Sequence, residues 1–247
     1  MGRIKTECQS MKDLKAILDT AKRWNVKLLV IGGWAVNAYI GTYRYTKDID
    51  LVMKTANTGS LKALLKQHGY DVADMKIYIA GKKEKVDVKI KIHISIGDII
   101  DTSRGFALKY SIGENAYCNA PLLPIRSYHP QCRENELCAP IIPINNLFIT
   151  KILPVGRELD VVDFVSLILN RREELDLDFI AKEIVKNNLT EAIKSRIEET
   201  ANDVKSGELE GLWMVHTGQR MSGKDRNEIR LLFLRQLAIR IRQLHVV

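Results

Sequence analysis

A strand-like run of apolar residues that ends in two glycines is the feature that most constrains how this chain can fold. Residues 26–31 end in Leu-Leu-Val-Ile, and Gly32 and Gly33 follow directly. A continuous apolar run is typical of a central strand covered on both faces, and glycine tolerates the positive φ of a tight turn. A helix over residues 34–40 would then present free N–H groups to an anion. The stretch predicts strand, turn and helix, with phosphates held at Gly32 and Gly33.

Two aspartates lie one residue apart in the next predicted strand, which reads Asp-Ile-Asp-Leu from Asp48. Side chains alternate along a strand, so Asp48 and Asp50 are expected on one face. Neighbouring carboxylates repel each other, and Mg²⁺ relieves that repulsion while leaving coordination positions open for phosphates and water. The pair therefore predicts a magnesium site.

A third aspartate, Asp87, is expected on the polar face of a strand over residues 86–94, together with Lys89, Lys91 and His93. If this strand pairs beside the first, at about 4.8 Å, the three acids would share one metal cluster. Two interpretations of the basic residues stay open. They form either a solvated sheet face or a basic floor for phosphates or an acceptor.

These motifs together resemble the nucleotidyltransferase superfamily that includes DNA polymerase beta. Within it, the chain is most similar to the lincosamide and aminoglycoside nucleotidyltransferases and to AbiE-type toxin enzymes. The resemblance covers residues 26–94 and is carried by these residues: Gly32, Gly33, Trp34, Ala35, Arg44, Thr46, Asp48, Ile49, Asp50 and Asp87. Many members have Gly-Ser where this chain has Gly-Gly.

The resemblance implies a mixed α/β sheet flanked by helices and followed by a C-terminal helical domain. It implies that Asp48 and Asp50 bind up to two Mg²⁺ ions and that Asp87 completes the site. Further nucleotide-binding candidates are these residues: Arg44, Thr46, Lys47 and Lys151. Arg44 and Lys47 would neutralise phosphates unless they are simply solvated. Lys151 would face a phosphate unless it pairs within a helix junction.

Composition and charge indicate the class of protein and of partner. The 247 residues are 46% hydrophobic and 28% charged, which is typical of a globular protein. The chain has no uninterrupted apolar run of about 18 residues, so a membrane span is not expected. The first residues do not resemble a secretory signal, and a cytoplasmic location is expected. A net charge of +8 suggests a polyanionic partner, either a nucleotide or RNA.

The chain has four cysteines. They do not form the framework of a small secreted disulfide-rich protein. Cys118, His129, Cys132 and Cys138 could surround a zinc ion, but their spacing fits no standard knuckle. Partly buried thiols in a loop, without stoichiometric zinc, are therefore expected.

The hydrophobic periodicity divides the chain into three parts. A catalytic core is expected over residues 1–110, a connecting segment over 111–145 and a helical domain over 146–247. The expected helices span residues 9–23, 60–68, 157–170, 176–187, 190–205 and 226–244. The last is apolar nearly all round, which predicts burial of the helix together with its arginines. Residues 75–80 and 86–94 are expected to form a hairpin around a turn at residues 81–84.

The predicted activity is Mg²⁺-dependent transfer of a nucleoside monophosphate from an NTP to an acceptor hydroxyl, with release of pyrophosphate. In a two-metal displacement, one ion activates the attacking oxygen and the other binds the leaving group. RNA is the favoured acceptor because Lys89, Lys91 and His93 lie on the strand face assigned to Asp87. The alternatives are a small-molecule, antibiotic-type acceptor and a non-catalytic nucleotide- or partner-binding module. The sequence leaves the oligomeric state open.

Overall fold

The computed structural model describes residues 2–41, 45–54, 58–75, 77–85, 87–105, 107–127, 129, 131–132, 136–154 and 157–245. The chain folds into two compact units. Unit 1 comprises Met1–Ile99 and Ser111–Pro143, and unit 2 comprises Ile100–Tyr110 and Ile144–Val247. Most of the segment expected to connect two domains, residues 111–143, therefore belongs to unit 1.

Unit 1 is built on a mixed five-stranded sheet of order β1-β2-β5-β4-β3. The strands are these: β1 (Leu28–Val30), β2 (Ile49–Met53), β3 (Asp71–Asp74), β4 (Tyr78–Lys85) and β5 (Val88–Ile96). Strand β2 pairs antiparallel with β1 and parallel with β5. The expected mixed α/β class is confirmed. Strand β2 lies between β1, which the glycine turn follows, and the basic strand β5.

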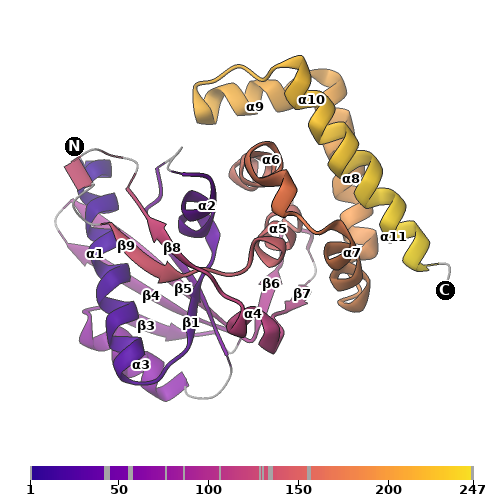
Figure 1. Cartoon of the computed structure of the whole chain (residues 1–247). Coiled ribbons are helices and arrows are strands. Elements are labelled where there is room, and N and C mark those ends of the chain that lie inside the picture. The colour runs from indigo at the N-terminus through magenta and orange to yellow at the C-terminus, as the bar shows by residue number, and fades with distance from the viewer. Residues whose placement is uncertain are drawn as a thin grey trace. The chain divides into compact units, whose positions relative to one another are not determined.

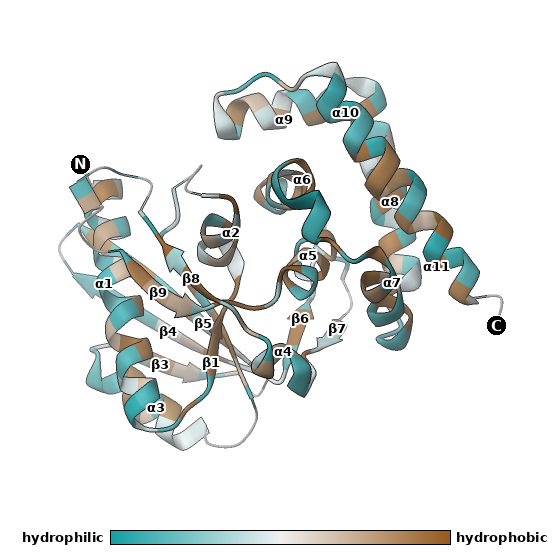
Figure 2. Ribbon diagram, viewed as in Figure 1, coloured by the Kyte–Doolittle hydropathy of each residue, from teal (hydrophilic) through white to brown (hydrophobic). Residues whose placement is uncertain are grey.

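Helices α1 (Gly2–Arg23) and α3 (Thr58–Gln67) pack together, α1 against β5 and α3 against β3 (Figure 1). In Figure 2, α1 alternates teal and brown along its length, as an amphipathic helix does. Its apolar side chains at Leu14 and Ile17 are fully buried, as are Ile90 and Ile92 of β5. Burial of this face of β5 leaves its polar residues on the opposite, open face.

The β4–β5 hairpin turns later than the sequence indicates. Strand β4 runs through residues 81–84, where a turn is expected, and pairs with β5 as far as Lys85 opposite Val88. A side chain at Gly81 would approach Ile92 to 2.5 Å and Tyr70 to 3.2 Å. This glycine therefore allows close packing inside a strand and does not form a turn.

The remaining described elements of unit 1 are helix α2 (Gly32–Ile40), helix α4 (Glu114–Cys118) and the paired strands β8 (Leu122–Ile125) and β9 (Leu137–Pro140). Helix α2 packs against β2 and β8. Cys8 of α1 forms a disulfide bond with Cys132, across a sequence separation of 124 residues. The expectation of a loop thiol is wrong for Cys132, because the fold brings it next to Cys8 from a distant segment. Cys118 and Cys138 are free and exposed.

Unit 2 is mainly helical, which confirms the expected C-terminal helical region. Strands β6 (Asp98–Asp101) and β7 (Leu108–Ser111) pair with each other. They lie at the two ends of Ile100–Tyr110, the first segment of unit 2. The helices are α5 (Ile144–Ile152), α6 (Glu158–Arg171), η2 (Arg172–Glu174), α7 (Leu177–Lys186), α8 (Thr190–Ser206), α9 (Glu208–Thr217), α10 (Gly223–Ile229), the π-helical η3 (Arg230–Leu237) and α11 (Ala238–His245). Three aromatic rings, Phe148, Phe164 and Phe233, meet in the core with centroids 5.0 to 6.3 Å apart.

The last helical stretch is not buried on all sides as expected. Its fully or nearly fully buried residues recur every four positions and are these: Ile229, Phe233, Leu237 and Ile241. Leu231 and Ile239 on other sides are 48% and 43% exposed, and Arg230 is exposed as well. The stretch is therefore amphipathic, with one face packed on unit 2. Among the described residues, none of the helices has the length and apolar character that crossing a membrane would require.

Candidate active site

The two aspartates lie where β2 begins. Asp48 directly precedes the strand and Asp50 is its second residue. Ile49 and Leu51, which alternate with them, are fully buried, whereas both aspartates are partly exposed. The strand therefore presents two carboxylates on its open face, in the arrangement that its period of two predicts.

Gly32 lies directly against Asp50. It begins α2 with φ at +66°, and a Cβ atom there would lie 2.3 Å from Oδ2 of Asp50 and 2.8 Å from its Cβ. The backbone N–H of Ile31 donates a hydrogen bond to the carbonyl oxygen of Asp50, at 3.0 Å. No side chain caps the start of α2. Only glycine fits here, and it brings the start of the helix to the carboxylate.

Strand β5 supplies a histidine at this point of the sheet. His93 is the register partner of Asp50, and its Nδ1 lies 3.5 Å from Oδ1 of that aspartate. The interaction with Asp50 raises the pKa of His93, while partial burial opposes that rise. The ring of Tyr78 meets the histidine edge-on at a centroid distance of 5.9 Å. The sequence placed His93 on a basic face, but only the strand register shows its contact with an aspartate.

Asp87 does not lie on β5 beside the aspartate pair, so that expectation is wrong. It occupies the β4–β5 turn with φ at +65°, and its side chain is 61% exposed and 3.7 Å from Nζ of Lys5. It precedes His93, the partner of Asp50, by six residues, which is about 20 Å along a strand. The physical reason is the extension of β4 to Lys85, which moves the turn to Asp87.

The site can be compared with the needs of a divalent cation. The described part of the chain contains no group of three His, Cys, Asp or Glu side chains placed to hold a metal ion. Mg²⁺, however, is commonly bound by one or two carboxylates together with waters and substrate phosphates. Asp48 and Asp50 supply two carboxylates of this kind, and the third carboxylate expected in the site, that of Asp87, lies in the β4–β5 turn.

The other candidates near the pair have different positions. Arg44 lies outside the described residues. Thr46 is buried and accepts a hydrogen bond of 3.4 Å from Nδ2 of Asn37. Gly33 is buried within α2. Lys47 is exposed and lines a cavity of about 470 Å³ in unit 1.

Lys151 lies in unit 2, on α5. Its side chain is buried, and Nζ lies 2.7 Å from Asp160 and 2.8 Å from Asp163 of α6. Two carboxylates already compensate its charge. Of the two roles expected for Lys151, the structure shows the pairing at the helix junction.

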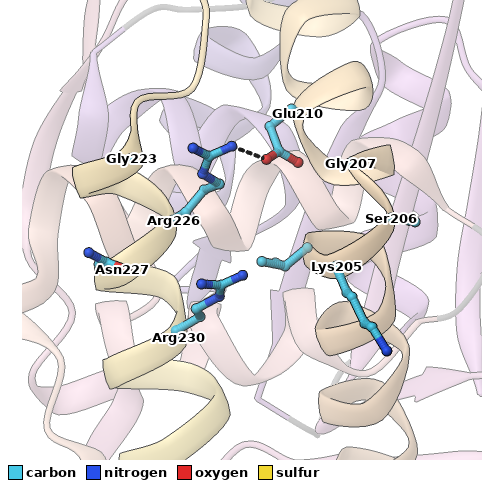
Figure 3. A pocket seen from close by; sticks show the side chains of 9 residues that line it. Lys205, Ser206, Gly207, Glu210, Gly223, Arg226, Asn227 and Arg230 are labelled. Carbon is cyan, nitrogen blue, oxygen red and sulfur yellow. Dashed lines mark hydrogen bonds and ion pairs between the residues drawn. The ribbon is translucent and has the colours of Figure 1, made fainter.

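A second cavity, of about 540 Å³, lies in unit 2 between the α8–α9 corner and α10. Figure 3 shows Arg226 and Arg230 reaching into it from neighbouring turns of one helical stretch. Arg226 pairs with Glu210 at 2.8 Å. None of the predicted site residues lines this cavity.

Comparisons with known proteins show what the chain is similar to. The sequence pattern of the aminoglycoside-2''-adenylyltransferase family matches residues 13–106, which include the glycine turn and the aspartate pair. A search of curated proteins finds no match to the sequence.

Two solved structures from Helicobacter pylori share the fold over almost the whole chain. JHP933 is 15% identical, with a TM-score of 0.52 over 96% of this chain and 94% of its own. A second protein, provisionally assigned as a nucleotidyltransferase, is 15% identical, with a TM-score of 0.53 over 96% of this chain and 97% of its own. Over residues 13–106 the chain is therefore similar to the aminoglycoside-2''-adenylyltransferase family, and over almost its whole length it shares the fold of the two Helicobacter pylori structures.

Proposed function

We propose that this protein is an Mg²⁺-dependent nucleotidyltransferase that moves a nucleoside monophosphate from an NTP to a hydroxyl group of a small molecule. The observation that carries the proposal is the contact between Gly32 and Asp50. This contact joins a carboxylate pair on a central strand to the start of a helix. The family pattern over residues 13–106 supports the same activity.

Each part of the site has a role in this reaction. The N–H groups at Gly32 and Gly33 bind phosphate oxygens, because the start of a helix carries partial positive charge. Asp48 and Asp50 hold one Mg²⁺ ion, which when bound neutralises the triphosphate and assists the departure of pyrophosphate. His93 orients the carboxylate of Asp50 through their contact.

The reaction exchanges one phosphoryl bond for another. The acceptor oxygen forms a bond to the α-phosphorus, and the bond from that phosphorus to the bridging oxygen of the β-phosphate breaks. Pyrophosphate leaves with the bonding electron pair, and the hydroxyl proton passes to solvent. The products are a nucleotidylated acceptor and pyrophosphate.

A small-molecule acceptor is preferred to RNA. The expectation of RNA came from the net charge of +8 and a basic strand face, but net charge describes association and not the reaction catalysed. The family whose pattern matches this chain is named for adenylylation of an aminoglycoside, a small hydroxyl compound. This match favours the antibiotic-type alternative over RNA.

The test is to follow the label from each α-³²P-labelled NTP in the presence of Mg²⁺, a panel of small hydroxyl compounds and total RNA. We expect label in the small-molecule fraction, and we expect EDTA to abolish transfer. Asp50→Asn serves as the inactive control. Label that enters RNA alone, or transfer unchanged in Asp50→Asn, would contradict the proposal.

A further inference from the structure

A cavity of about 470 Å³ in unit 1 is lined by both acidic and basic residues of the sheet and its turns. Its charged lining residues are Lys47, Glu84, Lys85, Asp87 and Lys89. Lys47 directly precedes Asp48, so the cavity begins next to the candidate active site. The turn at Asp87 and the start of β5 form another part of its wall.

The two acids of this cavity are already engaged by lysines. Glu84 contacts Lys82 at 2.9 Å and Lys89 at 3.0 Å, and these contacts hold the pKa of its carboxyl below its usual value. Asp87 pairs with Lys5 at 3.7 Å.

Two of the lining lysines are not compensated in this way. Within the described ranges, Lys47 and Lys85 have no ion-pair partner. The cavity therefore presents uncompensated positive charge.

The order of strands separates this cavity from the glycine turn. The turn follows β1 on one side of β2, whereas β5 and β4 lie on the other side. Lys91 precedes Ile92, the partner of Ile49, and therefore stands beside Asp48 on the open face. Lys82 is the partner of Lys91 on β4. The carboxylate pair thus lies between the glycine turn and two lysines, Lys91 and Lys82, which add positive charge beside the cavity without lining it.

We infer that the lysine-lined cavity binds the acceptor, and that the acceptor is a small hydroxyl compound carrying a phosphate or carboxylate group. The inference rests on the proposed function, because the nucleotide is assigned to the glycine side and leaves the β5 side for the acceptor. A polycation such as an aminoglycoside would meet Lys47 and Lys85 without a countercharge, and like charges repel across such a contact. The chain thus differs in acceptor charge from the substrate for which its related family is named.

The first experiment measures binding of three probes that share a hexose skeleton: glucose 6-phosphate, glucose and glucosamine. Isothermal titration is carried out on the full chain with Mg²⁺ and a non-hydrolysable ATP analogue. We expect glucose 6-phosphate to bind at least about tenfold more tightly than glucosamine, since charge-assisted hydrogen bonds are worth about 1.5 to 3 kcal/mol. Equal or tighter binding of glucosamine would overturn the inference.

Substitutions test whether the cavity is responsible. Lys47→Glu and Lys85→Glu should each weaken glucose 6-phosphate binding about tenfold. Arg230→Glu in unit 2 makes the same change in net charge and should leave the affinity as in the wild type. If Lys85→Glu and Arg230→Glu have equal effects, the general charge of the protein explains the binding and the inference fails.

The binding measurement requires no catalysis, so the two proposals fail separately. Loss of the proposed function would appear as no Mg²⁺-dependent transfer to any acceptor, while glucose 6-phosphate still bound through Lys47 and Lys85. Failure of the acceptor inference would appear as efficient labelling of an aminoglycoside by an enzyme that discriminates against anionic hydroxyl compounds.

Discussion

Gly32 combines a positive φ with direct packing against the carboxylate of Asp50. Gly32→Ala places a Cβ 2.3 Å from Oδ2 of Asp50 at a φ of +66°. We expect it to lower the free energy of unfolding by about 1 to 3 kcal/mol and to abolish transfer. Gly41→Ala is the matched control, because Gly41 also has positive φ, at +80°, but no atom of the described residues lies within 4 Å of its Cβ position.

Urea unfolding and transfer assays on both variants separate strain from contact. Gly41→Ala should be destabilised by backbone strain alone and should keep its activity. If both variants lost activity equally, the contact between Gly32 and Asp50 would not be what the site requires.

The three aspartates should differ in their effect on catalysis. Asp48→Asn and Asp50→Asn remove metal ligands, and we expect each to lower kcat/KM at least about a hundredfold, since even outer-shell partners cost about 10- to 100-fold. Asp87→Asn removes an exposed pair with Lys5 and one charge from the wall of the lysine-lined cavity, but no carboxylate of the aspartate pair. Such pairs are worth about 0.2 to 1 kcal/mol, so kcat/KM should stay within about fivefold of wild type. Loss of activity in Asp87→Asn equal to that in Asp50→Asn would return Asp87 to the metal site.

The residues of the candidate site that could be predicted from the sequence are those fixed by local rules. The alternation of a strand places Asp48 and Asp50 on one face, and glycine identity predicts the turn before α2. The contact of His93 with Asp50 depends on a register between strands that are far apart in the sequence. Local patterns carry no information on that register.

Among the elements, the β4–β5 hairpin shows why a turn can be misplaced. A glycine in a polar stretch predicts a turn, yet Gly81 lies in β4 because Ile92 and Tyr70 pack where its side chain would be. That contact is tertiary and involves a residue from the following strand. Because the turn lies later in the chain, Asp87 lies in it and not on β5 beside β2. The packing of Ile92 and Tyr70 against Gly81 thus removes Asp87 from the expected metal site.

The junction of α5 and α6 provides a prediction about a buried ion network. Lys151→Met removes the buried cation that pairs with both Asp160 and Asp163, and the side chain of Asp163 is fully buried. We expect a loss of about 3 to 5 kcal/mol in the free energy of unfolding, measured in urea. Arg157→Met is the control, because Arg157 contacts Asp160 at 3.5 Å but is 67% exposed, and it should cost at most about 1 kcal/mol.

A catalytic role of Lys151 would give a different result. If this lysine faced a phosphate, Lys151→Met would raise the KM for NTP while stability changed little. Replacing the two aspartates together with the lysine by apolar residues should recover stability, because buried ion networks are often replaceable by well-packed apolar side chains.

At the scale of the whole molecule, the sequence predicts the two kinds of structure but not how the chain is divided between them. Composition and periodicity indicate an α/β region followed by helices, and both are present. The units are discontinuous, however, because residues 100–110 belong to unit 2 and residues 111–143 to unit 1. Periodicity indicates which residues are buried but not which of the two cores they join. Residues 111–143 are therefore expected to connect the domains, although they belong to unit 1.

The disulfide between Cys8 and Cys132 connects distant parts of unit 1 across 124 residues. Closing so long a loop restricts the unfolded chain, an effect worth about 2 to 4 kcal/mol in typical proteins. We therefore expect Cys8→Ser, or reduction of the wild type, to lower the free energy of unfolding by about this amount. Urea unfolding with and without reductant measures the change.

Cys118→Ser and Cys138→Ser are the matched controls, because both thiols are exposed and free. Neither should alter stability in oxidising or reducing buffer, and Cys8→Ser should no longer respond to reductant. The difference between the oxidised and reduced wild type would then belong to the Cys8–Cys132 bond alone. Thiol titration of the folded, oxidised protein should find only the free cysteines, and four reactive thiols would contradict the pairing. Since the pairing links α1 to the segment between β8 and β9, both of unit 1, its loss should destabilise unit 1 without altering the core of unit 2.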